Sequence, residues 1–196
     1  MSEPIVDTPY VRVDRMPRID AAGLLVSVRL EPDAPVGSGP QTALAHALDA
    51  AGWWIGVGDD GRAMVGMGTT AGPVSLAVGA PLRPGEPVEV IARIPGRIGD
   101  RLEIEVRGTD SSARRGAVIG AALVPSPGPL LWGCRSLRDR VLPEQTFRGT
   151  VGPVVLIGDA AASADPESEA PVRRLAWDLV ARTDVDLLGA ADPVVL

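Results

Sequence analysis

The chain has 196 residues, of which 45% are hydrophobic and 22% charged, a composition that suits one globular domain with a full hydrophobic core. Its net charge of −6 argues against binding to nucleic acid or to an anionic membrane through electrostatic attraction. Its apolar runs are too short to cross a bilayer. The one cysteine, Cys134, excludes an intramolecular disulfide, and the N-terminal residues lack the pattern of a signal peptide. These features predict a cytoplasmic protein.

The first half of the chain reads as short strands separated by turns. Strands are predicted at 10–14 and 24–30. The segment 42–48 fits a helix by its alanine content and a strand by its context. A hairpin follows, in which 53–57 and 62–67 flank the sequence Asp59-Asp60-Gly61, because Asp-Gly supplies the left-handed backbone that tight hairpin turns require.

The second half continues in the same way. Strands are predicted at 73–78, 88–94 and 101–107, and the last of these alternates cleanly between apolar and charged residues. The segment 109–115 reads as a polar loop. Further short strands are predicted at 117–124, 130–132, 146–150 and 154–157. So many short strands with regular turns predict an all-β, antiparallel sandwich or barrel.

Composition also divides the chain. Residues 1–159 form the predicted β-sandwich domain, and 160–171 form an acidic connector of small residues. Residues 172–196 resume an apolar pattern and are predicted to pack back on the sandwich.

Few residues could support catalysis or metal binding. His46 is the only histidine, and one cysteine cannot complete a zinc site, so a histidine within the fold is the simpler interpretation. Cys134 could be activated by the neighbouring Arg135 or could pair with His46, but its spacing favours an inert, buried thiol. Asp59 and Asp60 are weak candidates for calcium ligands. The alternative is that they form the hairpin turn, which favours the same residue types for conformational reasons. No cofactor is expected.

The tryptophans are the better candidates for binding. Neighbours on a strand face opposite ways, so one ring of the pair Trp53 and Trp54 is predicted to enter the core and the other to face solvent or a partner. Trp53, Trp54, Trp132 and Trp177 are candidate interface anchors, with core packing as the alternative for each of them.

From Gly52 onward the order of features resembles the laminin-G/concanavalin A-like jelly-roll family. The resemblance rests on the segment from Gly52-Trp53-Trp54-Ile55 through Asp60-Gly61 to Met67, then on Pro81-Leu82 before the strand at 88–92, and on Phe147-Arg148-Gly149. It departs from the family in one respect, because Pro87 stands where a tryptophan usually begins that strand. It implies a jelly-roll sandwich, and glycan binding is frequent in this family.

The C-terminus is similar to one branch of that family. The segments 175–179 and 184–189 resemble those that follow the sandwich domain in the large subunit of N,N-dimethylformamidase. That resemblance implies an accessory domain of an iron-dependent amide hydrolase, whose iron is held by tyrosines and a carboxylate in a separate domain. Tyr10 is the only tyrosine here, so no metal-site residue carries over.

The sequence therefore predicts a protein that is not itself an enzyme. Its leading function is that of an accessory or assembly subunit for a dimethylformamidase-like catalytic chain. Its predicted partners are that larger chain or further copies of itself, with neither nucleic acid nor membrane among them. The alternative is a carbohydrate- or small-ligand-binding module that has no enzyme partner.

Overall fold

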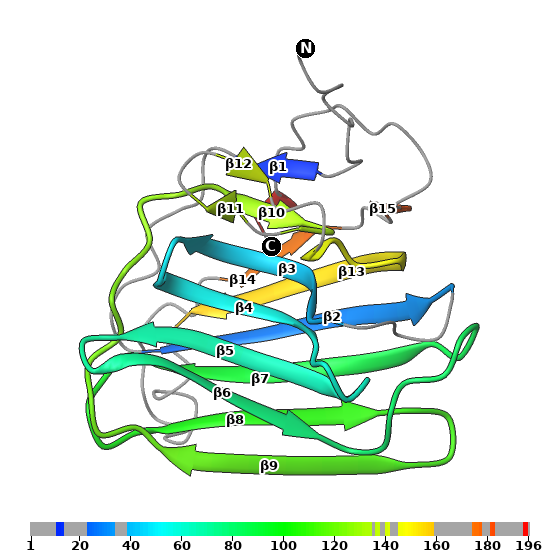
Figure 1. The fold of residues 1–196 in the computed structure, drawn as a ribbon, viewed down its shortest axis with the longest axis horizontal. Coiled ribbons are helices and arrows are strands. Elements are labelled where there is room, and N and C mark those ends of the chain that lie inside the picture. Colours follow the sequence, from blue (N-terminus) through cyan, green and yellow to red (C-terminus); the bar gives the residue numbers. More distant parts are fainter. Residues whose placement is uncertain are drawn as a thin grey trace.

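The computed structural model describes residues 11–13, 23–33, 39–134, 136–137, 140–141, 145–158, 174–177, 181–182 and 194–195, and side chains within 23–33, 39–134, 145–152 and 154–156. Two antiparallel sheets pack face to face as a sandwich (Figure 1). The predicted all-β fold class is confirmed. No helix in the described part of the chain is long and apolar enough to cross a membrane.

The first sheet, called sheet A here, holds the tryptophan hairpin. Its strand order is β1-β10-β3-β4-β5-β6, and the short strand β11 pairs with β3 and with β12. The strands are β1 (Val11–Val13), β3 (Gln41–Leu48), β4 (Ala51–Val57), β5 (Ala63–Thr69), β6 (Gly72–Val78), β10 (Leu130–Trp132), β11 (Ser136–Leu137) and β12 (Arg140–Val141).

The second sheet, called sheet B, lies behind sheet A in Figure 1. Its order is β16-β14-β13-β2-β7-β8-β9, with β15 also paired to β13. The strands are β2 (Gly23–Pro32), β7 (Val88–Pro95), β8 (Arg101–Arg107), β9 (Ser112–Val118), β13 (Gly149–Gly158), β14 (Arg174–Trp177), β15 (Ala181–Arg182) and β16 (Val194–Val195).

One continuous apolar core fills the space between the sheets. Alternate residues of each strand point inward, because successive side chains on a strand face opposite sides. Strand β8 shows this most clearly, since Leu102 and Ile104 are fully buried while Arg101 and Arg107 are exposed. Phe147 and Trp132 are the largest fully buried side chains.

The structure corrects four details of the strand prediction. The segment 42–48, left open between helix and strand, is strand β3. The two strands predicted at 146–150 and 154–157 are one strand, β13, whose register shifts between Val151 and Val154. The predicted polar loop at 109–115 lies mostly within β9. The strand predicted at 117–124 contains only the last two residues of β9, because 119–124 lie outside the named strands. Strand β9 shows little apolar alternation because it is an outer strand with little to bury, so periodicity could not identify it.

Candidate functional site

Three of the four candidate tryptophans lie inside the fold. Trp53 and Trp132 belong to the main core, and they pair in register with His46 and Leu44 of β3. Trp54 belongs to a separate cluster with Ala45, Ala47 and Met64. The two neighbouring rings therefore serve different clusters, as opposite faces of a strand require. Core packing, the alternative interpretation, accounts for all three rings.

Trp54 is buried even though it lies on the outer face of sheet A. Only 7% of its surface is exposed, so the solvent-facing position predicted for one ring of the pair is corrected to a buried one. One contact that covers the ring is with the cross-strand neighbour Gly66, where a Cβ atom would stand 2.2 Å from the indole Cε2. The indole thus lies flat in the space that a side chain at position 66 would fill.

The fourth candidate, Trp177, pairs in register with Val154 of β13 through strand β14. Its side chain lies outside the described residues, as do residue Arg135 and the connector 160–171.

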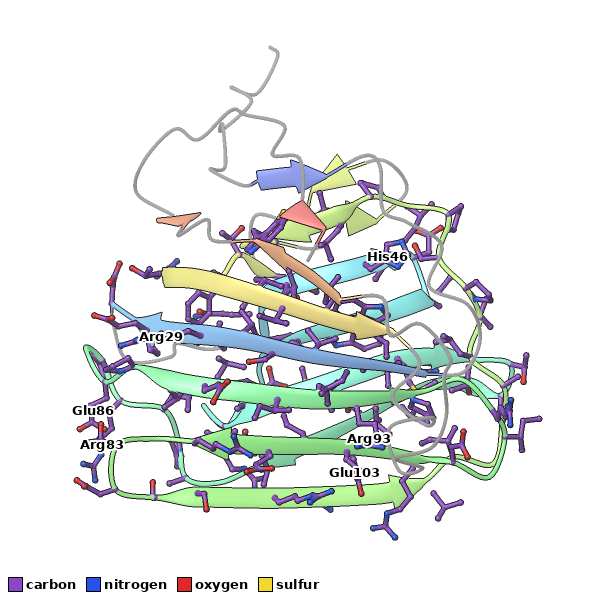
Figure 2. The ribbon with its side chains drawn as sticks, turned by 180° about the vertical axis from the view of Figure 1, so that it is seen from behind. Arg29, His46, Arg83, Glu86, Arg93 and Glu103 are labelled. Carbon is purple, nitrogen blue, oxygen red and sulfur yellow. The ribbon has the colours of Figure 1, made fainter. Side chains whose placement is uncertain are left out.

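The two potentially reactive side chains differ in burial, His46 being partly buried and Cys134 fully buried. His46 makes an edge-on contact with Trp53, with ring centroids 6.3 Å apart (Figure 2 labels His46 near one end of β3). Burial lowers the pKa of His46, and a hydrogen bond to the backbone of Gly128 opposes that shift only in part. Burial raises the pKa of Cys134 to about 12, so the thiol stays protonated at neutral pH. The buried, protonated thiol fits the inert cysteine that the sequence favours.

Asp59 and Asp60 occupy the turn between β4 and β5. Gly61 has φ of +77°, the left-handed conformation that the Asp-Gly turn was predicted to need. The Asp60 carboxylate accepts hydrogen bonds from the backbone N–H of Arg62 at 3.1 Å and from its Nε at 2.7 Å, and these bonds lower the pKa of Asp60. Within the described residues no group of three or more His, Cys, Asp or Glu side chains could hold a metal ion. The geometry at Asp60 fits the turn interpretation.

A surface hollow of about 510 Å³ lies beside this turn, between residues 59–61 and 80–84. The Leu82 N–H donates to the Gly61 carbonyl at 2.8 Å and ties the two loops together. Arg83 at its rim reaches Glu86 at 3.5 Å, and Figure 2 shows the two side by side. The hollow is open to solvent, and Asp60 within it already has a cationic partner.

The outer face of sheet B carries a lattice of arginine and glutamate side chains. Glu103 is its centre, with Arg114 Nη2 at 2.7 Å, Arg101 Nε at 3.4 Å and Arg93 Nε at 3.7 Å from its carboxylate oxygens. Figure 2 shows Arg93 and Glu103 together on this face, with Arg29 further along it.

A second group adjoins the first. Arg107 Nε contacts Glu105 Oε1 at 2.5 Å and lowers the pKa of that carboxyl, and Arg107 Nη1 lies 3.8 Å from Glu89. The alternation along 101–107 predicted the charged face. It does not predict the contribution of Arg114, because the polar composition of 109–115 predicts a loop there. The sequence signal that could have placed Arg114 on a strand is weak. It consists of the pair Arg114-Arg115 followed by Gly116-Ala117-Val118.

Comparison with known proteins identifies the fold and nothing finer. No protein-family model matches the sequence, and no curated protein matches it. Solved structures do resemble it. The LG1–3 region of the laminin α2 chain superposes with a TM-score of 0.57 at 12% identity, over 75% of this chain and 29% of that one. The Ruminococcus gnavus IT-sialidase CBM40 domain gives 0.55 at 9% identity, over 75% of this chain and 84% of that one.

A third structure, the enzymatically active domain of bacteriophage CBA120 tailspike protein 2, gives a TM-score of 0.50 at 13% identity, over 69% of this chain. This chain spans 22% of the tailspike and less than a third of the laminin chain. At these identities the likeness shows a LamG/concanavalin A-like sandwich.

Proposed function

We propose that this chain is a non-catalytic binding module that acts as the accessory subunit of a larger enzyme. The observation that carries the proposal is the placement of its chemically capable side chains. Cys134, Trp53, Trp54 and Trp132 are buried, and the pKa of Cys134 is raised to about 12. These side chains stabilise the sandwich, whereas the exposed surface carries charged groups suited to contact with another protein.

The finer part of the proposal concerns the partner. The C-terminal segment around 175–179 resembles the one that follows the sandwich domain in the dimethylformamidase large subunit. We therefore infer that the partner is an amide hydrolase of that type, which supplies the metal and the catalytic residues. Both chains would work in the cytoplasm, in line with the single, unpaired Cys134.

Glycan binding is the second candidate, and the likeness to the CBM40 domain of a sialidase favours it. Sugar-binding sites in proteins commonly stack the sugar ring on an exposed aromatic side chain. Within the described residues, however, Trp53, Trp54, Trp132 and Phe147 are all buried. This burial argues against an aromatic platform for a sugar ring, so glycan binding is kept as the second candidate.

Affinity purification from the source organism tests the proposal. A tag at the N-terminus leaves the C-terminal strands β14–β16 untouched. We expect a larger chain to co-purify in stoichiometric amount and to be identified by mass spectrometry. Recovery of this chain alone, as a monomer or homodimer, together with binding on a glycan array, would replace the accessory function with the glycan-binding one.

A further inference from the structure

Strand β9 is the outer strand of sheet B. Among the strands that the structure describes it pairs only with β8, and Figure 1 shows it at the margin of the sandwich. The ladder bonds at its two ends are Gly108 N–H to Ser111 O at 2.8 Å and Ile119 N–H to Asp100 O at 2.9 Å. Bonded and non-bonded pairs alternate in an antiparallel ladder, so the backbone groups of alternate residues between these ends face away from β8. These residues are Ser112, Arg114, Gly116 and Val118.

The outer strand of sheet A is protected in a way that β9 is not. In β6, Pro73 has no N–H to offer, and the carbonyl of Ala77 accepts a hydrogen bond from Arg115 Nη1 at 3.2 Å. Proline and capped carbonyls are common means of blocking strand addition. In β9 the Gly116 carbonyl is covered by Arg101 Nη2 at 3.3 Å, but none of the described residues bonds the outward N–H groups.

The side chains along β9 combine positive charge with exposed apolar groups. Arg114 is 62% exposed and Arg101 56% exposed, and both point to the outer face, where they share the carboxylate of Glu103. At the end of the strand, Val118 pairs with Arg101 and is 61% exposed. Ile98, in the neighbouring turn, is 64% exposed. Ile98 and Val118 are the exposed large hydrophobic residues of the described part of the chain.

We propose that β9 binds an extended acidic segment of a partner protein by strand addition. The inference rests on the accessory function proposed above and names the surface and the chemistry of the contact. Outward N–H groups of β9 would bond carbonyls of the added strand, which gives affinity that does not depend on sequence. Acidic side chains opposite Arg114 and Arg101 would form cross-strand charge pairs, and an apolar residue would cover Val118 and Ile98.

A second copy of this chain suits the same edge poorly. Pairing β9 with β9 would place the Arg114 side chains of both copies on neighbouring strands, each beside Arg101 of its own copy. Like charges across neighbouring strands are destabilising. The edge therefore selects a strand of opposite charge.

The direct test uses a short synthetic peptide of alternating glutamate and valine, titrated into the purified full chain. We expect its binding to shift the amide resonances of Ser112, Arg114 and Gly116 and to slow hydrogen exchange at those N–H groups. A matched peptide with lysine in place of glutamate should bind much more weakly. Raising the salt concentration should weaken binding of the glutamate peptide, because exposed charge pairs are screened.

Two variants separate backbone pairing from charge. Ser112→Pro removes an N–H that faces away from β8 and changes no charge, so the β8–β9 ladder remains while strand addition is blocked. Arg114→Glu should weaken binding of the glutamate peptide roughly three- to tenfold and strengthen binding of the lysine peptide. Arg29→Glu is the control, because Arg29 is exposed on β2, away from this edge.

The outcomes distinguish this inference from the proposed function. Equal loss of peptide binding in the Arg29 and Arg114 variants, or no response at the β9 amides, overturns strand addition. So does concentration-dependent protection of β9 without peptide, which would show pairing between copies. Co-purification of the larger chain by Ser112→Pro as efficiently as by the wild type overturns the inference and leaves the accessory function intact. Failure of the wild type to co-purify that chain, with peptide binding retained, removes the accessory function alone.

Discussion

The outer faces of the two sheets are built on opposite principles. On sheet A, the outer face around Trp54 is made of glycine, alanine and one large ring, and Ala45 and Ala47 are fully buried. On sheet B, the outer face along β7–β9 is a lattice of arginine and glutamate around Glu103. The first face depends on close packing, which is sensitive to a single methylene, and the second on exposed charge pairs, which are individually weak. Substitutions should therefore cost far more on sheet A than on sheet B.

Replacing the large ring of sheet A should have the greatest effect. Trp54→Ala removes the indole from its contact with Gly66 and leaves a cavity beside Met64. We expect the free energy of unfolding to fall by about 3–5 kcal/mol, as for other buried tryptophans. Urea denaturation followed by circular dichroism measures the change. A loss below about 1 kcal/mol would mean that the outer face of sheet A is not tightly packed.

Adding one methyl group tests the same contact from the other side. In Gly66→Ala the new Cβ would stand within 2.6 Å of three indole atoms, so Trp54 must move. Overpacking of this kind costs about 1–3 kcal/mol. Gly120→Ala is the matched control, because a Cβ at position 120 meets nothing within 4 Å. A shifted tryptophan fluorescence spectrum in the first variant alone would support the flat packing of the indole.

Acid should weaken sheet A through His46. Because burial lowers the pKa of His46 below its ordinary 6.5, the unfolded chain takes up the proton more readily than the folded one. Stability is therefore retained above about pH 6.5 and is lost as the pH falls from there through the folded pKa. We expect His46→Gln to flatten the loss of unfolding free energy between pH 7 and pH 5. An unchanged slope would assign the acid sensitivity to other groups.

The smallest effect should come from the centre of the lattice on sheet B. Glu103→Gln removes the carboxylate shared by Arg93, Arg101 and Arg114. Exposed pairs contribute up to about 1 kcal/mol, so we expect a loss no larger than that, and one that shrinks in high salt. Denaturation at low and high ionic strength checks both points. A salt-independent loss above about 2 kcal/mol would show that the two faces are not as different as their chemistry implies.

The strands predicted correctly are those whose residues must alternate to bury a core. The segment 101–107 is the clearest case, because Leu102, Ile104 and Val106 face the opposite sheet while the residues between them are charged. The hairpin at Asp59-Asp60-Gly61 was also predictable, because the left-handed φ of Gly61 is a local demand that the local sequence must meet. Strand β9 was missed because an outer strand buries little on either side.

The candidate site was harder to predict than the fold. The sequence shows that Trp53 and Trp54 face opposite sides of one strand, but it does not show what lies across from each ring. Trp54 packs against Gly66, which lies twelve residues along the chain and is its neighbour across β4 and β5. The sequence likewise contains Arg101, Glu103 and Arg114, and only the pairing of β8 with β9 brings them together.

The sequence by itself determined the class of fold, the turn chemistry and the shortage of reactive groups. These follow from the composition, from the alternation of apolar and polar residues along each strand, and from short motifs. None of them depends on which distant segments pair. Tertiary structure alone decided the order of strands in each sheet, the burial of Trp54 and the exposure of the β9 edge. Each of these depends on which distant segments pair, and in a sandwich that choice is set by the joint packing of both sheets, which no single segment encodes.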